Sequence, residues 1–311
     1  MVYINGLTSR FPDIKVTQGE IVNLSRKIFS KSFNDFEKIS KVYKNSGVKS
    51  RFLVKELSWY QKKHNWKERN ALFKTHSIKL LSKCISESLQ KSKIRPEQIG
   101  SIVLINSTGI STPTLDAELI NLFKLKNDIK RLPIFGYGCA GGVLGLIRGS
   151  ELQNITQNPV LVCNVEICSL TFRPQVLSKA NVVSTALFGD GACSYILDSG
   201  GVCKLKKNVE FTWKNTEKLM GWNIEDDGLG VIFDKQIPTF INNNLPDIVK
   251  RYFDKKFNGY ILHSGGMKII NAYKNIFNDH LSIGFSENVL ENYGNVSSVS
   301  VLLVLEKMLK E

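Results

Sequence analysis

Two separated stretches of this 311-residue chain repeat one another in the same order. The run YGCAGGVLGL (137–146) aligns with YGNVSSVSVLL (293–303), and VLINSTG (103–109) aligns with YILHSGG (260–266). The spacing also agrees, with 33 residues from Asn106 to Cys139 and 32 from His263 to Asn295. Self-similarity in one register indicates repeated structural units. We therefore predict two related halves packed into one body, with the crossover between them at 198–208.

Apolar, strand-like runs alternate with helical stretches along the chain. Strands are predicted for SIVLINS, RLPIFGY, PVLVCNVEI, ACSYIL and GYILHS, which begin at residues 101, 131, 159, 192 and 259. Helices are predicted for 70–90 and 142–153. This alternation is typical of an α/β fold with a parallel or mixed sheet.

The composition excludes several classes of protein. The net charge is +14, but the lysines are scattered and form no basic stripe with aromatic residues. We therefore predict no nucleic-acid partner, and a Lys-rich surface that attracts anionic substrates such as phosphorylated cofactors. No apolar run reaches the roughly 18 residues of a membrane span, and no signal peptide is visible, which predicts a cytoplasmic protein. The six cysteines follow no disulfide or zinc spacing, so we expect free thiols and no metal site.

The run GYGCAGGVLG (136–145) permits two interpretations. Its glycines at 136, 138 and 141 match the G-x-G-x-x-G fingerprint of a dinucleotide-binding turn, as in an oxidoreductase. However, Glu166 lies 28 residues after Gly138, whereas the acidic residue of that fingerprint follows at about 20. A cysteine also stands between the second and third glycines. This interpretation is the weaker of the two.

The second interpretation is a nucleophilic Cys139. A thiol at a helix start meets unpaired backbone N–H groups and the positive end of the helix dipole, which predicts a lowered pKa. Flanking glycines let a thioester approach and let backbone N–H groups face a developing oxyanion. The alternative is a buried cysteine that permits close helix packing, and this stretch alone does not decide between them.

His263 and Asn295 bear on that choice. His263 ends a predicted strand, where it is either a core histidine or a donor aimed into a cleft. Asn295 precedes a predicted helix and either caps it or reaches the same cleft. Their register with Asn106 and Cys139 favours convergence near a central seam.

Several motifs together resemble the type III polyketide synthases, the chalcone synthase-like branch of the thiolase-fold condensing enzymes. The motifs are NSTGISTPTLDAEL, GYGCAGGVLGL, VEICSLTFRP, STALFGDGACSYIL, GWNIEDDGLGVIF, HSGG and ENYGNVSSVSVLLVLEKM. The resemblance implies two duplicated halves in αβαβα layers, a homodimer and no tightly bound cofactor. The halves would span 1–200, with the nucleophile, and 201–311, with the His and Asn.

The resemblance also implies the roles of individual residues. Cys139 would take the starter acyl group from coenzyme A, and His263 and Asn295 would hydrogen-bond the thioester carbonyl of malonyl-CoA. Decarboxylative Claisen condensation would then build a short polyketide such as a pyrone, a resorcinol or a chalcone-like product. Further implied positions are the gatekeeper Phe188, the cavity residues Cys168, Thr171, Val231 and Ser297, Thr112 reaching into the partner's cavity, and Lys38 and Lys41 at the CoA phosphates.

Three features depart from the family pattern. Ser264 replaces a proline after the histidine, Asn45 stands where a CoA-contacting lysine is common, and the terminal strand hairpin is expected to be missing. Two alternatives therefore stay open beside the dinucleotide enzyme. One is a ketoacyl synthase III-like enzyme that uses acyl carrier protein, and the other is an inactive thiolase-fold partner protein. The starter, the number of extensions and the cyclisation mode are not predicted.

Overall fold

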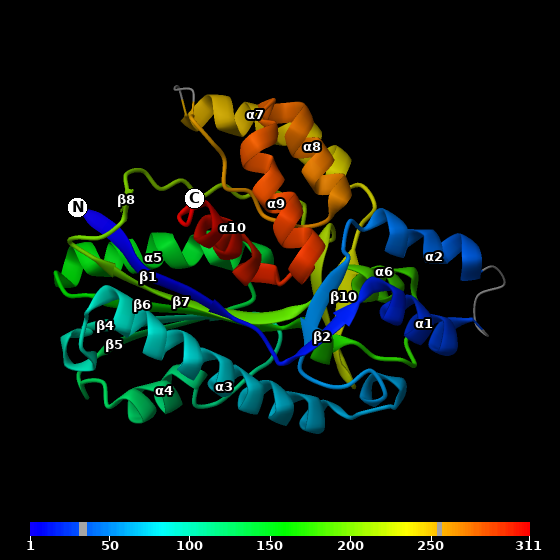
Figure 1. Cartoon of the computed structure of the whole chain (residues 1–311), viewed down its shortest axis with the longest axis horizontal. Coiled ribbons are helices and arrows are strands. Elements are labelled where there is room, and N and C mark those ends of the chain that lie inside the picture. The colour runs from blue at the N-terminus through cyan, green and yellow to red at the C-terminus, as the bar shows by residue number, and fades with distance from the viewer. Residues whose placement is uncertain (31–35, 254–256) are drawn as a thin grey trace.

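The computed structural model describes residues 1–30, 36–253 and 257–311. Its centre is a mixed six-stranded sheet in the order β5-β4-β6-β7-β1-β8 (Figure 1). β4 is parallel to β5 and β6, whereas β6–β7, β7–β1 and β1–β8 are antiparallel. The strands are β1 (Val2–Arg10), β4 (Ser101–Asn106), β5 (Lys130–Phe135), β6 (Val160–Ile167), β7 (Asp190–Asp198) and β8 (Cys203–Leu205). Four of the five predicted strands are confirmed by this sheet.

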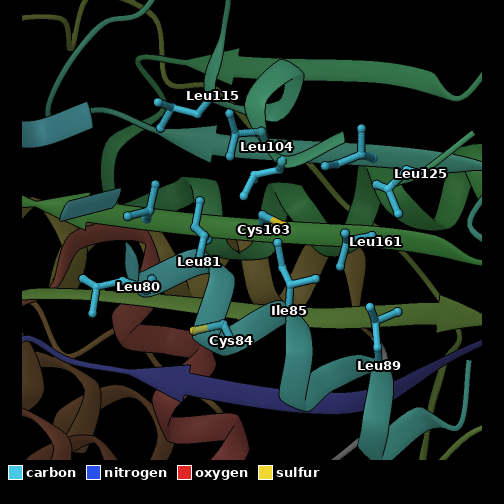
Figure 2. Packing of buried hydrophobic residues seen from close by; sticks show 14 of the residues in the cluster. Leu80, Leu81, Cys84, Ile85, Leu89, Leu104, Leu115, Leu125, Leu161 and Cys163 are labelled. Carbon is cyan, nitrogen blue, oxygen red and sulfur yellow. The ribbon is translucent and has the colours of Figure 1, made fainter. Parts of the chain in front are cut away.

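Helices cover both faces of the sheet, which explains why the central strands read as nearly continuous apolar runs. On one face lies α3 (Trp66–Ser92), with α4 (Leu115–Phe123) beside it. Figure 2 shows side chains of α3 packed against the sheet, with Cys84 and Ile85 at the contact and Leu161 and Cys163 opposite them. The predicted helix at 70–90 is confirmed within α3.

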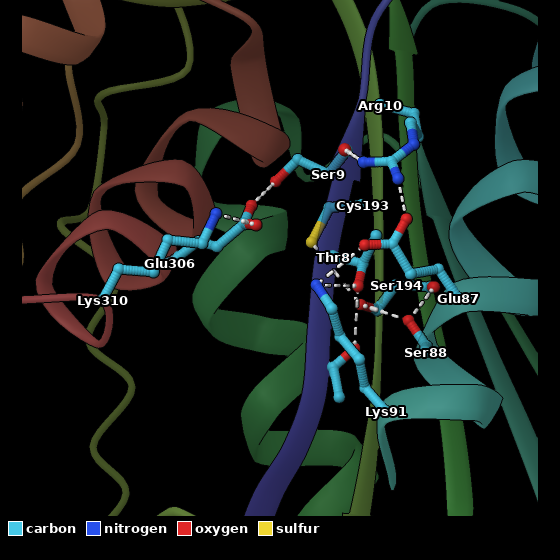
Figure 3. A network of polar contacts seen from close by, with 11 residues as sticks. Thr8, Ser9, Arg10, Glu87, Ser88, Lys91, Cys193, Ser194, Glu306 and Lys310 are labelled. Atoms are coloured by element: carbon cyan, nitrogen blue, oxygen red, sulfur yellow. Dashed lines mark hydrogen bonds and ion pairs between the residues drawn. The ribbon is translucent and has the colours of Figure 1, made fainter.

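The opposite face carries α5 (Gly141–Thr156) and α10 (Ser300–Met308). A polar network links α10 to β1 and α3 across the sheet edge (Figure 3). Glu306 accepts from Ser9 and pairs with Lys310, while Glu87 pairs with Arg10 and Lys91. These contacts hold α10 against β1, and α10 packs on the same face as α5, so the two repeated motifs of the sequence lie close together.

A smaller layer packs against the carboxyl ends of the central parallel strands. It contains β2 (Ile14–Thr17), α1 (Gln18–Phe29), α2 (Phe36–Asn45), β3 (Ser50–Leu53) and α6 (Lys179–Leu187). Thr17 and Glu20 form a capping box that starts α1 directly after β2. Buried aromatic residues of α1 and α2, including Phe29 and Tyr43, pack against α6 within this layer.

The chain after residue 200 forms the hairpin β9 (Met220–Glu225) and β10 (Gly228–Phe233) and the helices α7 (Ile237–Tyr252), α8 (Met267–Phe277) and α9 (His280–Tyr293). The strand prediction for GYILHS is wrong, because 259–264 belongs to no strand. A strand requires a hydrogen-bonded neighbour, and the described residues place none beside this segment. Within the described ranges, no helix is long and apolar enough to cross a membrane.

Candidate active site

Cys139 lies in a single 3-10 turn, η3 (Gly138–Ala140), between the end of β5 and the start of α5. The chain reaches this turn through Gly136 and Gly138, which adopt φ values of 91° and 52° that favour glycine. The Gly138 N–H donates to Ser107 Oγ at 2.8 Å, so this amide is already occupied by the protein. The two glycines therefore shape the turn that presents Cys139.

The next glycines have a different task, which is close packing. A Cβ atom on Gly141 would lie 2.6 Å from Ile105 Cγ2, and one on Gly142 would lie 2.3 Å from the Ser298 carbonyl oxygen. Residues Ser297–Val299 form the 3-10 turn η5 that precedes α10, so the two repeats meet at this contact. The glycine run thus shapes the turn at Cys139 and permits a tight packing contact between η5 and α5, rather than forming a pyrophosphate cradle.

Cys139 and Asn295 face each other at this contact. The Sγ atom of Cys139 lies 4.0 Å from Oδ1 of Asn295. The fully buried Asn295 side chain accepts from the Ser297 N–H at 2.8 Å and donates through Nδ2 to the Gly265 carbonyl at 3.3 Å. These bonds orient the amide and leave one Nδ2 hydrogen for a substrate. The structure therefore brings together two of the predicted residues.

His263 reaches the same neighbourhood through the turn that follows it. The Gly265 N–H donates to the His263 carbonyl at 2.9 Å, and Gly265 in turn accepts from Asn295. Both ring nitrogens of His263 are buried, and neither has a hydrogen-bond partner among the described residues. Burial lowers the pKa of the imidazole to about 4, so it is neutral at pH 7. Asn106, its predicted counterpart, instead bonds the Gly109 carbonyl.

The structure adds a residue that the sequence analysis did not assign to the site, Glu166. This fully buried carboxylate accepts from the Ser298 hydroxyl at 2.8 Å and the Ser297 hydroxyl at 3.3 Å. It also accepts from the Ser107 N–H at 3.0 Å and the Thr108 hydroxyl at 3.1 Å. Burial raises its pKa to about 7. An acid inside the apolar run of β6 was the available signal, since buried acids are rare.

The predicted low pKa of Cys139 is contradicted. Burial raises the pKa of this thiol to about 11. The Ser297 side chain lowers the pKa, Glu166 raises it and the Asn295 side chain lowers it, but each of these effects is smaller than that of burial. The helix itself begins only at Gly141, after the 3-10 turn. Desolvation and a neighbouring acid therefore outweigh the helix dipole in this arrangement.

An apolar cavity of about 50 Å³ adjoins the site, and it accounts for three of the predicted binding residues. Phe188, Cys168 and Thr171 line it, together with residues of α1, α6 and β3. Ser297 lies instead between Asn295 and Glu166. Val231 pairs with Trp222 in the β9–β10 hairpin and lines none of the described cavities.

The remaining predicted residues lie at the surface. Lys38 and Lys41 are exposed on α2, and Thr112 is exposed in the loop between β4 and α4. In the described part of the chain, no group of three or more His, Cys, Asp or Glu side chains could hold a metal ion.

Comparison with known families decides the assignment. Residues 4–201 match the family model of the N-terminal domain of chalcone and stilbene synthases, and residues 204–311 match that of the C-terminal domain. The chain belongs to the chalcone and stilbene synthase family. It is accordingly an acyl-transferring, condensing enzyme of the type III polyketide synthase class. Its reaction is the condensation of an acyl-CoA with malonyl-CoA. This function is supported over the two alternatives, an enzyme that uses acyl carrier protein and an inactive partner protein.

Curated relatives agree with the family. The "Putative chalcone synthase" of Bacillus subtilis (strain 168) is 32% identical, with 100% of this chain and 91% of that protein covered. A 1,3,6,8-tetrahydroxynaphthalene synthase of Streptomyces peucetius subsp. caesius is 28% identical, over 95% of this chain and 82% of the relative.

Solved structures support the fold. The 1,3,6,8-tetrahydroxynaphthalene synthase of Streptomyces coelicolor A3(2) superposes with a TM-score of 0.93 at 22% identity, covering 99% of this chain and 90% of that one. CsyB in complex with CoA-SH gives a TM-score of 0.86 at 22% identity, with 100% and 92% covered. The predicted thiolase-like α/β fold is thereby confirmed.

Proposed function

We propose that Cys139 carries the acyl chain of this polyketide synthase and that His263 and Asn295 hold the carbonyl of malonyl-CoA. In the loading step, the Cys139 sulfur attacks the thioester carbon of an acyl-CoA starter. The new S–C bond forms as the bond to the CoA sulfur breaks, and the thiol proton leaves with free CoA. His263 is the proposed acceptor of that proton during the attack, because its imidazole is neutral and its backbone is linked through Gly265 to Asn295, the thiol's partner.

The single observation that carries this proposal is the state of the His263 ring. Both nitrogens are buried without a partner among the described residues. An unsatisfied buried polar group costs about 1–3 kcal/mol, which a bound carbonyl oxygen would recover. A neutral ring donates one N–H, and Asn295 has one remaining amide hydrogen, so the pair supplies two donors to one oxygen.

These donors suit the second step. Loss of CO2 from a malonyl thioester breaks a C–C bond and leaves an enolate, whose negative charge resides on the thioester oxygen. Donors placed at that oxygen stabilise the transition state. The enolate carbon then attacks the carbonyl carbon of the Cys139 thioester, forming a C–C bond as the C–S bond breaks, and the released thiolate is protonated from solvent. No further base is required, because decarboxylation itself generates the carbanion.

The surface residues complete the proposal for CoA. Lys38 and Lys41 of α2 would bind the CoA phosphates, and this attraction should weaken as the salt concentration rises. Thioesters of CoA are the expected substrates, without a tightly bound cofactor. Acyl-CoA and malonyl-CoA supply would place the enzyme in the cytoplasm.

We further propose a homodimer in which Thr112 reaches the partner's cavity. Support comes from the exposed edge strand β5 and from large apolar side chains near it. Phe135 is 47% exposed, Tyr137 51% and Ile110 49%. Unpaired sheet edges and exposed apolar residues are typical of surfaces that a second chain covers. The division of the chain near residue 200 remains part of this proposal.

The function is tested by incubating the protein with malonyl-CoA and a panel of starters from aromatic to long-chain acyl-CoA. Mass spectrometry should find acylated Cys139 and extended products for at least one starter. Absence of both the acyl-enzyme and any extended product across the panel would contradict the proposal.

A further inference from the structure

Arg51 of β3 is a charged side chain that is buried between the proposed active site and the smaller layer that contains α1, α2 and α6. Only 1% of its surface is exposed, and burial lowers the pKa of its guanidinium to about 10. No acidic group among the described residues forms an ion pair with it. Burying a charge is costly, so the guanidinium must be stabilised by other hydrogen-bond partners.

Those partners are backbone carbonyls at the end of α6. One terminal nitrogen donates to the Thr185 carbonyl at 2.8 Å and the Phe188 carbonyl at 3.1 Å, and the other donates to the Ala186 carbonyl at 3.0 Å. The second nitrogen also donates to Gln18 Oε1. A helix leaves its last carbonyls without helical partners and has a negative end, which explains how this position accommodates a cation.

The segment that Arg51 holds is the one that holds Asn295. The Asn295 N–H donates to the Leu187 carbonyl at 2.8 Å, and the Gly189 N–H donates to the Asn295 carbonyl at 3.0 Å. Phe188, between these two contacts, lines the cavity. The backbone of a proposed catalytic residue is therefore hydrogen-bonded to a chain segment in which one guanidinium bonds three carbonyls.

The strand that carries Arg51, β3, and the residue before it also contact the chain just before Asn295. The Lys49 N–H donates to the Glu291 carbonyl at 2.8 Å, and the Ser50 hydroxyl donates to the Asn292 carbonyl at 3.2 Å. Gly294 has a φ of 69°, and a Cβ there would lie 2.6 Å from the Leu187 carbonyl oxygen. The chain before Asn295 is therefore held by backbone contacts with Lys49 and Ser50, and Asn295 itself is bonded to the segment that Arg51 contacts.

From this geometry we infer that Arg51 is a positioning residue for decarboxylation, acting through residues 185–189 on Asn295 and Phe188. This rests on the proposed role of Asn295. Arginine is required because its planar fork reaches several carbonyls at once, whereas a lysine ammonium is a single point donor on a flexible chain. Gln18 orients the fork, since its amide also donates to the Ala186 carbonyl at 3.1 Å.

The test is Arg51→Lys in the full chain, with CO2 release from labelled malonyl-CoA, acyl loading of Cys139 and thermal stability measured together. We expect kcat for CO2 release to fall about ten- to a hundredfold, because small displacements of a transition-state donor are costly. KM for malonyl-CoA and the rate of Cys139 acylation should change less than about threefold, the pattern expected when only a transition-state interaction is lost.

Arg69→Lys is the matched control. Arg69 is also buried and donates to backbone carbonyls, those of Leu170 and Asp227, but among the described residues it makes no hydrogen bond to 185–189 or to Asn295. This variant should lose stability without a selective loss of decarboxylation. If Arg51→Lys does not fold, Gln18→Ala replaces it, and we expect the same selective loss at about threefold or more.

The outcomes separate the two proposals. A parent protein that releases no CO2 contradicts the proposed function itself. An active parent with an unchanged kcat in the folded Arg51 or Gln18 variant overturns the positioning role. It is also overturned if loading, decarboxylation and stability fall in parallel, as in Arg69→Lys.

Discussion

The Sγ atom of Cys139 lies 4.0 Å from Oδ1 of Asn295, although 156 residues separate them in the sequence. The contact exists because the η3 and η5 turns, each followed by a helix, pack directly against one another. Gly141 and Gly142 are the residues that permit this distance. The close packing of α5 against η5 and α10 therefore also sets the distance between Cys139 and Asn295.

Gly142→Ala tests that connection. The added methyl would lie 2.3 Å from the Ser298 carbonyl oxygen and 2.5 Å from Val301 Cγ1, so α5 and α10 must separate. We expect a loss of about 1–3 kcal/mol in the free energy of unfolding, typical of overpacking, with a loss of condensing activity. Denaturant unfolding and product formation measure both.

Gly284→Ala is the control for this change. A Cβ on Gly284 meets nothing within 4 Å, and the residue lies inside α9. Alanine should therefore stabilise the protein by about 0.5–1 kcal/mol and leave product formation unchanged. Equal stability of the Gly142 variant and the parent would show that the two helices do not pack this closely.

Glu166 should govern the reactivity of Cys139 near neutral pH. Its pKa of about 7 means that it is mostly ionised at pH 8, where its negative charge raises the pKa of the Cys139 thiol. Glu166→Gln removes that charge, so the thiol pKa falls and alkylation at pH 8 becomes about threefold faster or more. Below pH 6 the carboxyl of the parent is largely neutral, and the two rates should converge. Iodoacetamide labelling between pH 5.5 and 8.5 measures this, and a constant rate ratio across that range would contradict it.

Cys139 should still be the most readily alkylated of the six cysteines. The thiols of Cys163, Cys168 and Cys193 are buried with pKa values raised well above the ordinary value, and that of Cys84 is raised to about 12. Cys203 is half-buried, like Cys139, and burial also raises the pKa of its thiol, so it is the cysteine that competes with Cys139 for the reagent. Mass mapping after brief labelling distinguishes the two, with dominant Cys203 labelling as the contrary result.

A change in the cavity should alter which starters the enzyme accepts without altering the release of CO2 from malonyl-CoA. Thr171→Phe would fill much of the 50 Å³ space beside Phe188 and Cys168. We expect turnover of the bulkiest accepted starter to fall about tenfold or more, with CO2 release from malonyl-CoA within about threefold of the parent. The same change at Val231, which lines none of the described cavities, should not alter starter selection. Equal effects at both positions would contradict this placement of the cavity.

The sequence predicted the parts of the site that depend on local pattern. The repeat aligned Cys139 with Asn295 because each precedes a helix in its own repeat. Three of the four confirmed strands, β4, β6 and β7, have apolar runs that are buried on both faces, whereas β5 forms the exposed edge of the sheet. Glu166 and Arg51 were not assigned, since their partners come from segments far away in the chain. The Cys139 pKa was predicted wrongly for the same reason: its desolvation is set by tertiary neighbours. GYILHS failed as a strand because apolar pattern does not supply a pairing partner.

The most direct test of the account is labelled CO2 release from malonyl-CoA by the parent, Cys139→Ala and Asn295→Ala. Carrying the chain requires the thiol, whereas decarboxylation requires only donors on the malonyl carbonyl. Cys139→Ala should lose acyl loading and condensation but keep slow CO2 release. Asn295→Ala should lose about a hundred- to a thousandfold in CO2 release, the usual effect of removing one such donor. Loss of CO2 release in the Cys139 variant as complete as in the Asn295 variant would contradict the division of roles between thiol and amide.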